Sequence, residues 1–394
     1  MSTVACEELE LTLLMPCLNE AETLESCICK AKRALDALQI PGEVLIADNG
    51  STDGSIEIAQ SCGARIVHVV EKGYGSALRA GIAHARGRYI VMGDADDSYD
   101  WSQMGPFYER LAAGEELVMG CRLPMGGGTI RPGAMPFLHR WLGNPVLSFI
   151  GRLFFKCAVT DFHCGLRGFS AQAIRRLNLQ AHGMEFASEM IAKAGLSRLR
   201  ISEVPITLHP AGRTRPPHLR TWRDGWRHLR FMLMFCPKWL FFIPGLVMVL
   251  FGLLNFICVL PGPLMIGAVG FDVNTLLIGS FVGLVGFQCM SFGFFARIYG
   301  LAEGVAPRDP LLDRILSFFT LERGLIAGVI LLLTGGGLLF RALLYWGAHD
   351  FGALSYPVGL RMVIPAVTLA ALGVQTLFLS FFLNIFGVKN RQRA

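Results

Sequence analysis

The second half of the chain contains four long runs of apolar residues, and these constrain the fold more than any other feature. They cover residues 239–260, 275–295, 324–346 and 362–386. A helix needs about 20 residues to cross a bilayer, and each run reaches that length. Only 17% of the residues are charged, and most of them precede residue 240, whereas an average soluble domain has about a quarter. We therefore predict a membrane domain of four helices over residues 236–394. The alternative is a set of buried helices in a soluble domain.

Positive charges near the predicted spans indicate their orientation. Lys and Arg collect before the first span, after the second (Arg308 and Arg314 among them) and after the fourth. The loop after the first span has none, and the loop after the third has only Arg361. Because such residues favour the cytosolic side, we predict a multi-pass protein of the cytoplasmic (inner) membrane. The first half and both termini would lie in the cytosol. The acidic start, MSTVACEELE, has no apolar run behind basic residues, so we expect no signal peptide.

The first 235 residues alternate short apolar segments with segments of helical periodicity. Predicted strands cover residues 11–15, 43–48, 64–70 and 88–93, and predicted helices lie between them. Strands that alternate with helices form right-handed crossover units and a mostly parallel sheet. The sequence therefore predicts an α/β domain with a Rossmann-like sheet over residues 1–235.

Polar motifs follow each of the four predicted strands. They are PCLNE at 16–20, DNGS at 48–51, KGYG at 72–75 and DADD at 94–97. Sheets of this kind bind ligands beyond the carboxyl ends of their strands. We therefore expect these motifs to meet at one edge of the sheet and to form a binding site there.

The DADD motif indicates the kind of ligand. Asp94 and Asp96 flank one small residue, and two such carboxylates can offer oxygen ligands to Mg²⁺ or Mn²⁺, which would hold a diphosphate. Alone, the pattern is equally typical of a solvated acidic turn, and the three neighbouring motifs favour the metal site. The glycines at 73 and 75 do not complete a dinucleotide-binding fingerprint, because position 78 is Leu. Asp97 is predicted to cap a helix or to be solvated.

In their order and spacing, the motifs over residues 9–235 resemble the inverting family-two glycosyltransferases, which have the glycosyltransferase-A fold. The segments DFHCGLRGF at 161–169, EFASE at 185–189 and GR at 212–213 are similar to those of polyprenyl-phosphate sugar synthases, the dolichyl-phosphate mannose and glucose synthase group. The resemblance implies a glycosyltransferase-A catalytic domain followed by an all-α transmembrane domain. Cys17-Leu18 and Asn49 depart from the family pattern in the base-binding pocket, so the nucleotide stays open.

The resemblance also implies a role for each site residue. The donor nucleotide would be bound by Pro16, Leu18, Glu20, Asp48, Lys72 and Asp94. The metal ion, Mg²⁺ or Mn²⁺, would be held by Asp94 and Asp96, and phosphate by Arg167 and Arg213. The catalytic set would be Asp96, Asp161, Arg167 and Arg213, and the acceptor region would include Glu185 and Glu189.

The implied reaction is the metal-dependent, inverting transfer of a hexose from a UDP- or GDP-sugar to undecaprenyl or dolichyl phosphate. It would take place at the cytosolic membrane face and supply a lipid-linked sugar for cell-envelope glycans. A lipid phosphate is already largely anionic, since its second pKa is about 6, and needs no general base. A hydroxyl acceptor would need one, and Asp161 or Glu185 would be the candidate.

Two other functions compete with this one. A glycolipid synthase would glycosylate a lipid hydroxyl, and a non-catalytic membrane scaffold would transfer nothing. The net charge of +6 is shared by both halves, which disfavours a nucleic-acid partner. A homo-oligomer through the membrane domain stays open.

Two further segments are amphipathic but too polar to span a membrane. Residues 136–156 and 221–235 interleave Trp, Phe and Leu with basic side chains. Such helices lie in the headgroup plane, with basic residues toward anionic lipid. We therefore predict that both dock the catalytic domain on the membrane. The alternative for the first segment is that it packs inside the domain.

Overall fold

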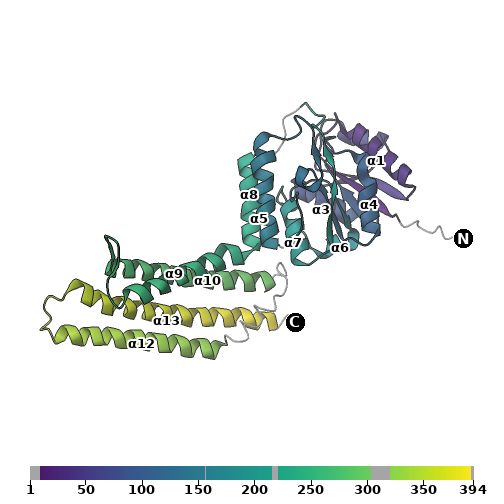
Figure 1. Cartoon of the computed structure of the whole chain (residues 1–394). Coiled ribbons are helices and arrows are strands. Elements are labelled where there is room, and N and C mark those ends of the chain that lie inside the picture. The colour runs from purple at the N-terminus through teal and green to yellow at the C-terminus, as the bar shows by residue number, and fades with distance from the viewer. Residues whose placement is uncertain (1–8, 156, 215–220, 303–319, 392–394) are drawn as a thin grey trace. The chain divides into compact units, whose positions relative to one another are not determined.

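The computed structural model describes residues 9–155, 157–214, 221–302 and 320–391 (Figure 1). The chain divides into two compact units, Met1–Phe235 and Cys236–Ala394. Lys156, Arg308 and Arg314, which contributed to the predictions of membrane docking and orientation, lie outside the described residues.

The first unit is built on a seven-stranded sheet with the order β3-β2-β1-β4-β7-β5-β8. Strand β7 runs antiparallel to β4 and β5, and the other neighbours are parallel. This confirms the predicted mostly parallel α/β sheet. The strands are β1 (Leu11–Cys17), β2 (Gly42–Asp48), β3 (Arg65–His68), β4 (Tyr89–Met92), β5 (Leu117–Cys121), β7 (Arg167–Ser170) and β8 (Ile201–Pro205).

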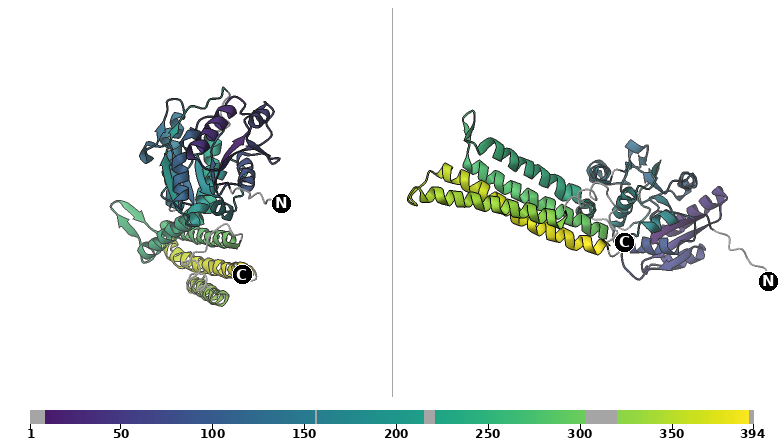
Figure 2. Two further views of the ribbon diagram at one scale, coloured as in Figure 1. Left: turned by 90° about the vertical axis from the view of Figure 1, so that its right-hand side faces the viewer. Right: turned by 90° about the horizontal axis from the view of Figure 1, so that it is seen from below.

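The sheet is covered by helices on both faces, which explains why its central strands are apolar throughout. In β1, Leu13, Leu14 and Met15 are all completely buried. Helices α1 and α4 lie on one face and α3, α6 and α7 on the other (Figures 1 and 2). The helices around the sheet are α1 (Leu24–Leu38), α2 (Ser55–Ser61), α3 (Tyr74–His84), the short η1 (Trp101–Met104), α4 (Gly105–Ala112), α6 (Ala171–Arg176) and α7 (Phe186–Leu196).

The two predicted docking segments are helical. A π-helical turn, η3 (His139–Gly143), leads into α5 (Asn144–Phe155), and the second segment is α8 (Thr221–Phe235). Helix α5 packs against both α7 and α8 (Figure 1). The short turn η2 (Pro124–Gly126) and a two-stranded sheet of β6 (Thr129–Ile130) and β9 (Thr207–Leu208) complete the unit.

Among its described residues, the second unit contains four helices long and apolar enough to cross a membrane, which confirms the predicted spans. In the most apolar 18-residue stretch of each helix, only 11% to 33% of the residues are buried. Most apolar side chains therefore face outward, and the alternative of buried helices in a soluble domain is wrong. The helices are η4 (Lys238–Phe242) continuing into α9 (Ile243–Val259), α10 (Val273–Ala302), α12 (Leu321–Gly347) and α13 (Tyr356–Arg391).

The membrane helices pack as neighbouring pairs, α9 on α10 and α12 on α13 (Figure 2). A short hairpin of β10 (Leu264–Ile266) and β11 (Val269–Phe271) connects α9 to α10. Helix α10 meets α13 through a buried hydrogen bond of 2.5 Å between the hydroxyls of Ser280 and Thr368. Hydroxyl pairs of this kind join helices in lipid, where no water competes for them.

Candidate active site

The carboxyl ends of β3, β2, β1 and β4 lie next to one another, and the four polar motifs follow them. At the end of β2, the carboxylate of Asp48 accepts hydrogen bonds from the backbone N–H groups of Gly50 and Ser51, at 3.0 and 3.1 Å. These bonds turn the chain sharply and hold Asp48 at the edge of the sheet, where it is 2% exposed. Pro16 is half-buried in β1, and Leu18, just beyond this strand, is exposed.

The two acids of the DAD motif differ in environment. Asp94 accepts a hydrogen bond of 3.0 Å from the Tyr74 hydroxyl. Burial, reinforced by the nearby negative charge of Asp96, raises the pKa of Asp94 to about 6. Asp96 accepts two hydrogen bonds from Ser98, of 3.1 Å from the backbone and 2.5 Å from the hydroxyl. Its second oxygen is left for a partner from elsewhere in the chain.

That partner is Arg213, which contacts two separate motifs. Its Nη2 lies 3.2 Å from Oδ2 of Asp96, and its Nη1 donates to Oε1 of Glu20 at 2.8 Å. The backbone N–H of Gly212 also donates to the carbonyl of Asp96 at 2.9 Å. The guanidinium therefore bridges the predicted nucleotide wall and the predicted metal-binding motif. Arg213 and Glu20, 193 positions apart in sequence, meet here.

Asp97 points away from this centre. It has a positive φ of 59°, and its carboxylate pairs with Lys30 of α1 at 2.7 Å. The prediction that Asp97 caps a helix is wrong, because Asp100 caps the following turn η1 by accepting from the N–H of Ser102.

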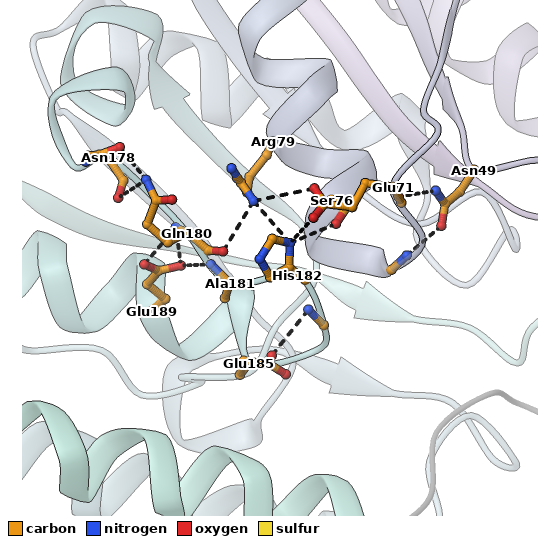
Figure 3. Close-up of polar contacts among 12 residues, drawn as sticks. Asn49, Glu71, Ser76, Arg79, Asn178, Gln180, Ala181, His182, Glu185 and Glu189 are labelled. Carbon is orange, nitrogen blue, oxygen red and sulfur yellow. Dashed lines mark hydrogen bonds and ion pairs between the residues drawn. The ribbon is translucent and has the colours of Figure 1, made fainter.

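The segment between β3 and α3 carries Lys72 and is held from two sides (Figure 3). On one side, Asn49 bonds to its backbone, and Nζ of Lys72 donates to the carbonyl of Asn49 at 2.7 Å. On the other side, the carbonyl of His182 accepts from the N–H groups of Gly75 and Ser76. A Cβ at Gly75 would lie 2.3 Å from the carbonyl oxygen of Ala181, so only glycine permits this approach.

The two predicted acceptor-region acids support the loop that contains His182. Glu189 is 2% exposed and accepts from the backbone N–H groups of Gln180 and Ala181 at 2.9 and 2.7 Å. It also pairs with Lys193 at 2.8 Å. Glu185 accepts from the N–H of Gly183 (Figure 3). The enclosed carboxylate of Glu189 therefore holds this loop in place, and a role for Glu189 in the acceptor region would be through the loop it supports.

Arg167 is also part of the scaffold. Its guanidinium is completely buried and donates to the backbone carbonyls of Cys164, Ala187 and Phe162, at 2.8, 2.7 and 3.3 Å. Burial lowers the pKa of Arg167 from its usual value. The prediction that Arg167 holds phosphate is wrong, because its donors are used by the backbone and no face of it is open to a ligand.

Asp161 is enclosed in the same way. It is fully buried, and its two oxygens accept from Nε and Nη2 of Arg122 at 2.7 and 2.8 Å. A general base needs a free oxygen that reaches the substrate. The geometry therefore contradicts a catalytic role for Asp161 as a base and assigns it to fixing Arg122, which follows β5.

Comparison with known proteins identifies the family. Residues 12–177 match the model "Glycosyl transferase family 2", and residues 294–387 match "Glycosyltransferase family 2 C-terminal transmembrane region". The low-salt glycan biosynthesis hexosyltransferase Agl6 of Haloferax volcanii is 39% identical over 381 residues, which cover 96% of this chain and 89% of that protein. The chain belongs to glycosyltransferase family 2.

Other relatives of this family 2 glycosyltransferase match about half of the chain. A dolichyl-phosphate hexose transferase of Haloferax volcanii is 27% identical over 197 residues, which cover 50% of this chain and 82% of that protein. Among solved structures, glucosyl-3-phosphoglycerate synthase from Mycobacterium tuberculosis, in complex with Mn²⁺, UDP and glucosyl-3-phosphoglycerate, aligns with 58% of this chain and 80% of that chain. The sequence identity is 23% and the TM-score 0.45.

The family assignment confirms the resemblance drawn from the sequence. The chain is a glycosyltransferase, with an α/β domain of the glycosyltransferase-A class followed by a membrane region of long apolar helices, in which the β10–β11 hairpin joins α9 to α10.

Two groups of polar residues in this glycosyltransferase were missed from the sequence. The first is the pair that Arg122 forms with Asp161. Arg122 directly follows β5, and this position at a strand end could have indicated it. The other joins α8 to the 161–165 segment: the Ser188 hydroxyl lies 2.8 Å from Nδ1 of His228 and 3.4 Å from Nε2 of His163. His228 is one of the basic residues of the segment 221–235 that was predicted to dock on anionic lipid. It does not face lipid, because its side chain is 8% exposed and contacts Ser188.

Proposed function

We propose that this glycosyltransferase transfers a hexose from a UDP- or GDP-sugar to a polyprenyl phosphate, such as undecaprenyl or dolichyl phosphate. The observation that carries the proposal is the bridge of Arg213 between Glu20 and Asp96. It makes the nucleotide wall, the acidic motif and a phosphate-binding cation one continuous site. The hexosyltransferase that matches 96% of the chain supports a hexose. The shorter dolichyl-phosphate relative supports a polyprenyl phosphate acceptor.

The residues present fit a divalent ion of the Mg²⁺ or Mn²⁺ type. Asp94 and Asp96 follow β4 and supply carboxylate oxygens, which are the ligands such ions prefer. Burial, together with the charge of Asp96, raises the pKa of Asp94, and a cation beside the two acids would favour their charged forms. Among the described residues, no three His, Cys, Asp or Glu side chains gather to hold a metal ion. The remaining ligands would be donor phosphates and water, as is usual for Mg²⁺. When bound, the ion would neutralise charge on the leaving diphosphate.

The chain's own residues then have to bring two anions together and orient them. In the proposed reaction, an oxygen of the lipid phosphate attacks the anomeric carbon from the face opposite the diphosphate. The new carbon–oxygen bond forms as the bond to the diphosphate breaks, and the diphosphate leaves with the electron pair. In this proposal Arg213, beside Asp96, and Lys72, beside the carbonyl of Asn49, would hold the phosphates at the edge of the sheet.

A lipid hydroxyl is the less supported acceptor, because it must lose a proton to a base. Asp161 is bonded to Arg122 through both oxygens. Glu185, the other candidate, accepts from the N–H of Gly183 at the start of α7. A phosphate monoester, which arrives largely ionised, fits a site without a ready base.

We also propose that η3, α5 and α8 dock the first unit on the cytosolic leaflet. Trp141 and Phe149, on η3 and α5, are 63% and 58% exposed, and Trp226 on α8 is 58% exposed. Exposed aromatic side chains on amphipathic helices with nearby basic residues are typical of an interfacial helix. Arg140, which lies over the Trp141 ring at 5.4 Å, would meet anionic headgroups. The chain would then be a multi-pass protein of the cytoplasmic membrane, with its catalytic unit and both termini in the cytosol.

The proposal is tested by transfer of radiolabelled sugar. Membranes with the full-length protein are incubated with labelled UDP- and GDP-hexoses, Mn²⁺ or Mg²⁺, and either polyprenyl phosphate or diacylglycerol. We expect label in an acid-labile lipid phosphate, and no transfer by Asp96→Ala or after chelation of the metal. Label in acid-stable glycolipid would instead identify a glycolipid synthase. Absence of transfer from every donor would favour a scaffold.

A further inference from the structure

The sequence pattern placed Asn49 in the base-binding pocket. In the structure, its side chain is instead bonded to the segment that follows β3. It is 5% exposed, and its backbone N–H donates to the carbonyl of Cys17 at 2.9 Å. Its side chain points toward the segment that follows β3 (Figure 3). Nδ2 donates to the carbonyls of Val69 and Glu71, at 3.2 and 2.8 Å. Oδ1 accepts from the N–H of Gly73 at 2.8 Å.

These bonds fix the segment that carries Lys72. The ammonium of Lys72 returns to the carbonyl of Asn49 at 2.7 Å. It also lies over Gly50, where an added Cβ would be 2.2 Å from Nζ. The side chain of Asn49 thus fixes the backbone of residues 69–73, and its carbonyl fixes the position of the Lys72 ammonium. Lys72 itself is exposed, so without these bonds its long side chain would sample many positions.

We propose that Asn49 is a positioning residue for the donor, which acts by holding Lys72 where the diphosphate of the nucleotide sugar binds. The inference rests on the proposed function and names a residue that the proposed reaction does not itself require. The carboxamide is essential to the role, because it donates and accepts at once. An aspartate at position 49 would keep the acceptor for Gly73 but place a charged oxygen against two carbonyls, which costs more than losing the hydrogen bonds alone.

A double-mutant cycle on nucleotide binding tests the proposal. Binding of UDP and of GDP, each with Mn²⁺, is measured by calorimetry on the full-length protein in detergent. We expect Asn49→Asp and Asn49→Ala to weaken binding by about tenfold each, the equivalent of one or two lost hydrogen bonds. In a Lys72→Met background, where the charge is already absent, the same substitutions should have little further effect. Asn178→Asp, which adds the same charge on the exposed loop beside Gln180, should bind like wild type.

Three results would overturn the inference. An equal tenfold loss in the Lys72→Met background would show that Asn49 acts by another route. Wild-type affinity of both Asn49 variants, with a weakened Lys72→Met, would show that Lys72 needs no support. A wild-type protein that binds neither nucleotide would overturn the proposed function, and this inference with it. Thermal unfolding is measured for every variant, and where Asn49→Asp does not fold, the cycle is run with Asn49→Ser.

Discussion

Arg122 and Asp161 form a two-pronged ion pair inside the catalytic unit, with Nε 2.7 Å from Oδ2 and Nη2 2.8 Å from Oδ1. Arg122 is 8% exposed and Asp161 is not exposed at all. The backbone N–H of Arg122 also donates to Asp161 at 3.0 Å. The pair links the end of β5 to the segment before β7. It therefore connects the two ends of the long segment between these strands, which contains α5.

We predict that Asp161→Asn destabilises the catalytic unit. Removing one partner of a buried pair leaves the other charge uncompensated, at a cost of about 3 kcal/mol or more. Urea unfolding of the detergent-solubilised protein, followed by near-ultraviolet circular dichroism, measures the change. A variant that unfolds like wild type but has lost turnover would restore the role of Asp161 as a base.

We predict that Arg213→Lys lowers transfer by about tenfold, although the charge is kept. An ammonium cannot reach Glu20 and Asp96 together in the planar geometry of a guanidinium. Arg65→Lys is the matched control, since Arg65 makes a similar forked contact with Glu43 at the amino end of the strands. Steady-state kinetics with the nucleotide sugar measures both variants. Equal losses in the two would mean that Arg213 acts only through stability.

Arg167→Lys should affect stability and not phosphate binding. The substitution removes hydrogen bonds to buried backbone carbonyls, including those of Cys164 and Ala187, at a cost of about 2 kcal/mol. We expect a lower melting temperature, with the Michaelis constants for donor and acceptor unchanged at temperatures where the variant is folded. An unchanged melting temperature with a weakened acceptor would return Arg167 to the phosphate site.

Combined Trp141→Ser and Phe149→Ser substitutions should impair transfer to a long-chain lipid in vesicles by about tenfold. Each substitution removes favourable burial of an aromatic side chain in the membrane interface. Transfer to a short, water-soluble prenyl phosphate should stay at the wild-type rate. Met125→Ser serves as control, because Met125 is exposed but lies outside the docking helices. A double variant that is equally slow with both acceptors would show that these side chains support the fold and not docking.

The first four strands, the four motifs and the membrane spans could be predicted, because each depends on local sequence. Strands β5, β7 and β8, which complete the sheet, were not predicted. Apolar runs and alternating segments are properties of neighbours in the chain. The polar ends of parallel strands must meet at one edge. The family pattern selected Glu20, Asp96 and Arg213 as separate site residues, and the structure shows that Arg213 contacts both acids.

What a charged side chain does once it is inside the domain could not be predicted. Arg167 and Arg213 look alike in sequence, but one points into the interior toward backbone carbonyls and the other toward carboxylates. The direction depends on which segments pack nearby, and such contacts are non-local. His228 shows the same limit, since helical periodicity marks two faces of α8 but does not tell which one touches Ser188.

Under the proposed function, the loop at residues 178–183 would make nucleotide binding sensitive to salt concentration. Proteins often bind phosphate with the amides at the start of a helix. Here the amides of Gly75 and Ser76, at the start of α3, already donate to the peptide oxygen of His182. Under the proposed function, the affinity for a diphosphate would therefore depend on the formal charges of Arg213 and of the exposed Lys72. Mobile ions screen such charges over about 10 Å at 0.1 M salt, so donor occupancy should follow the ionic strength of the surrounding solution.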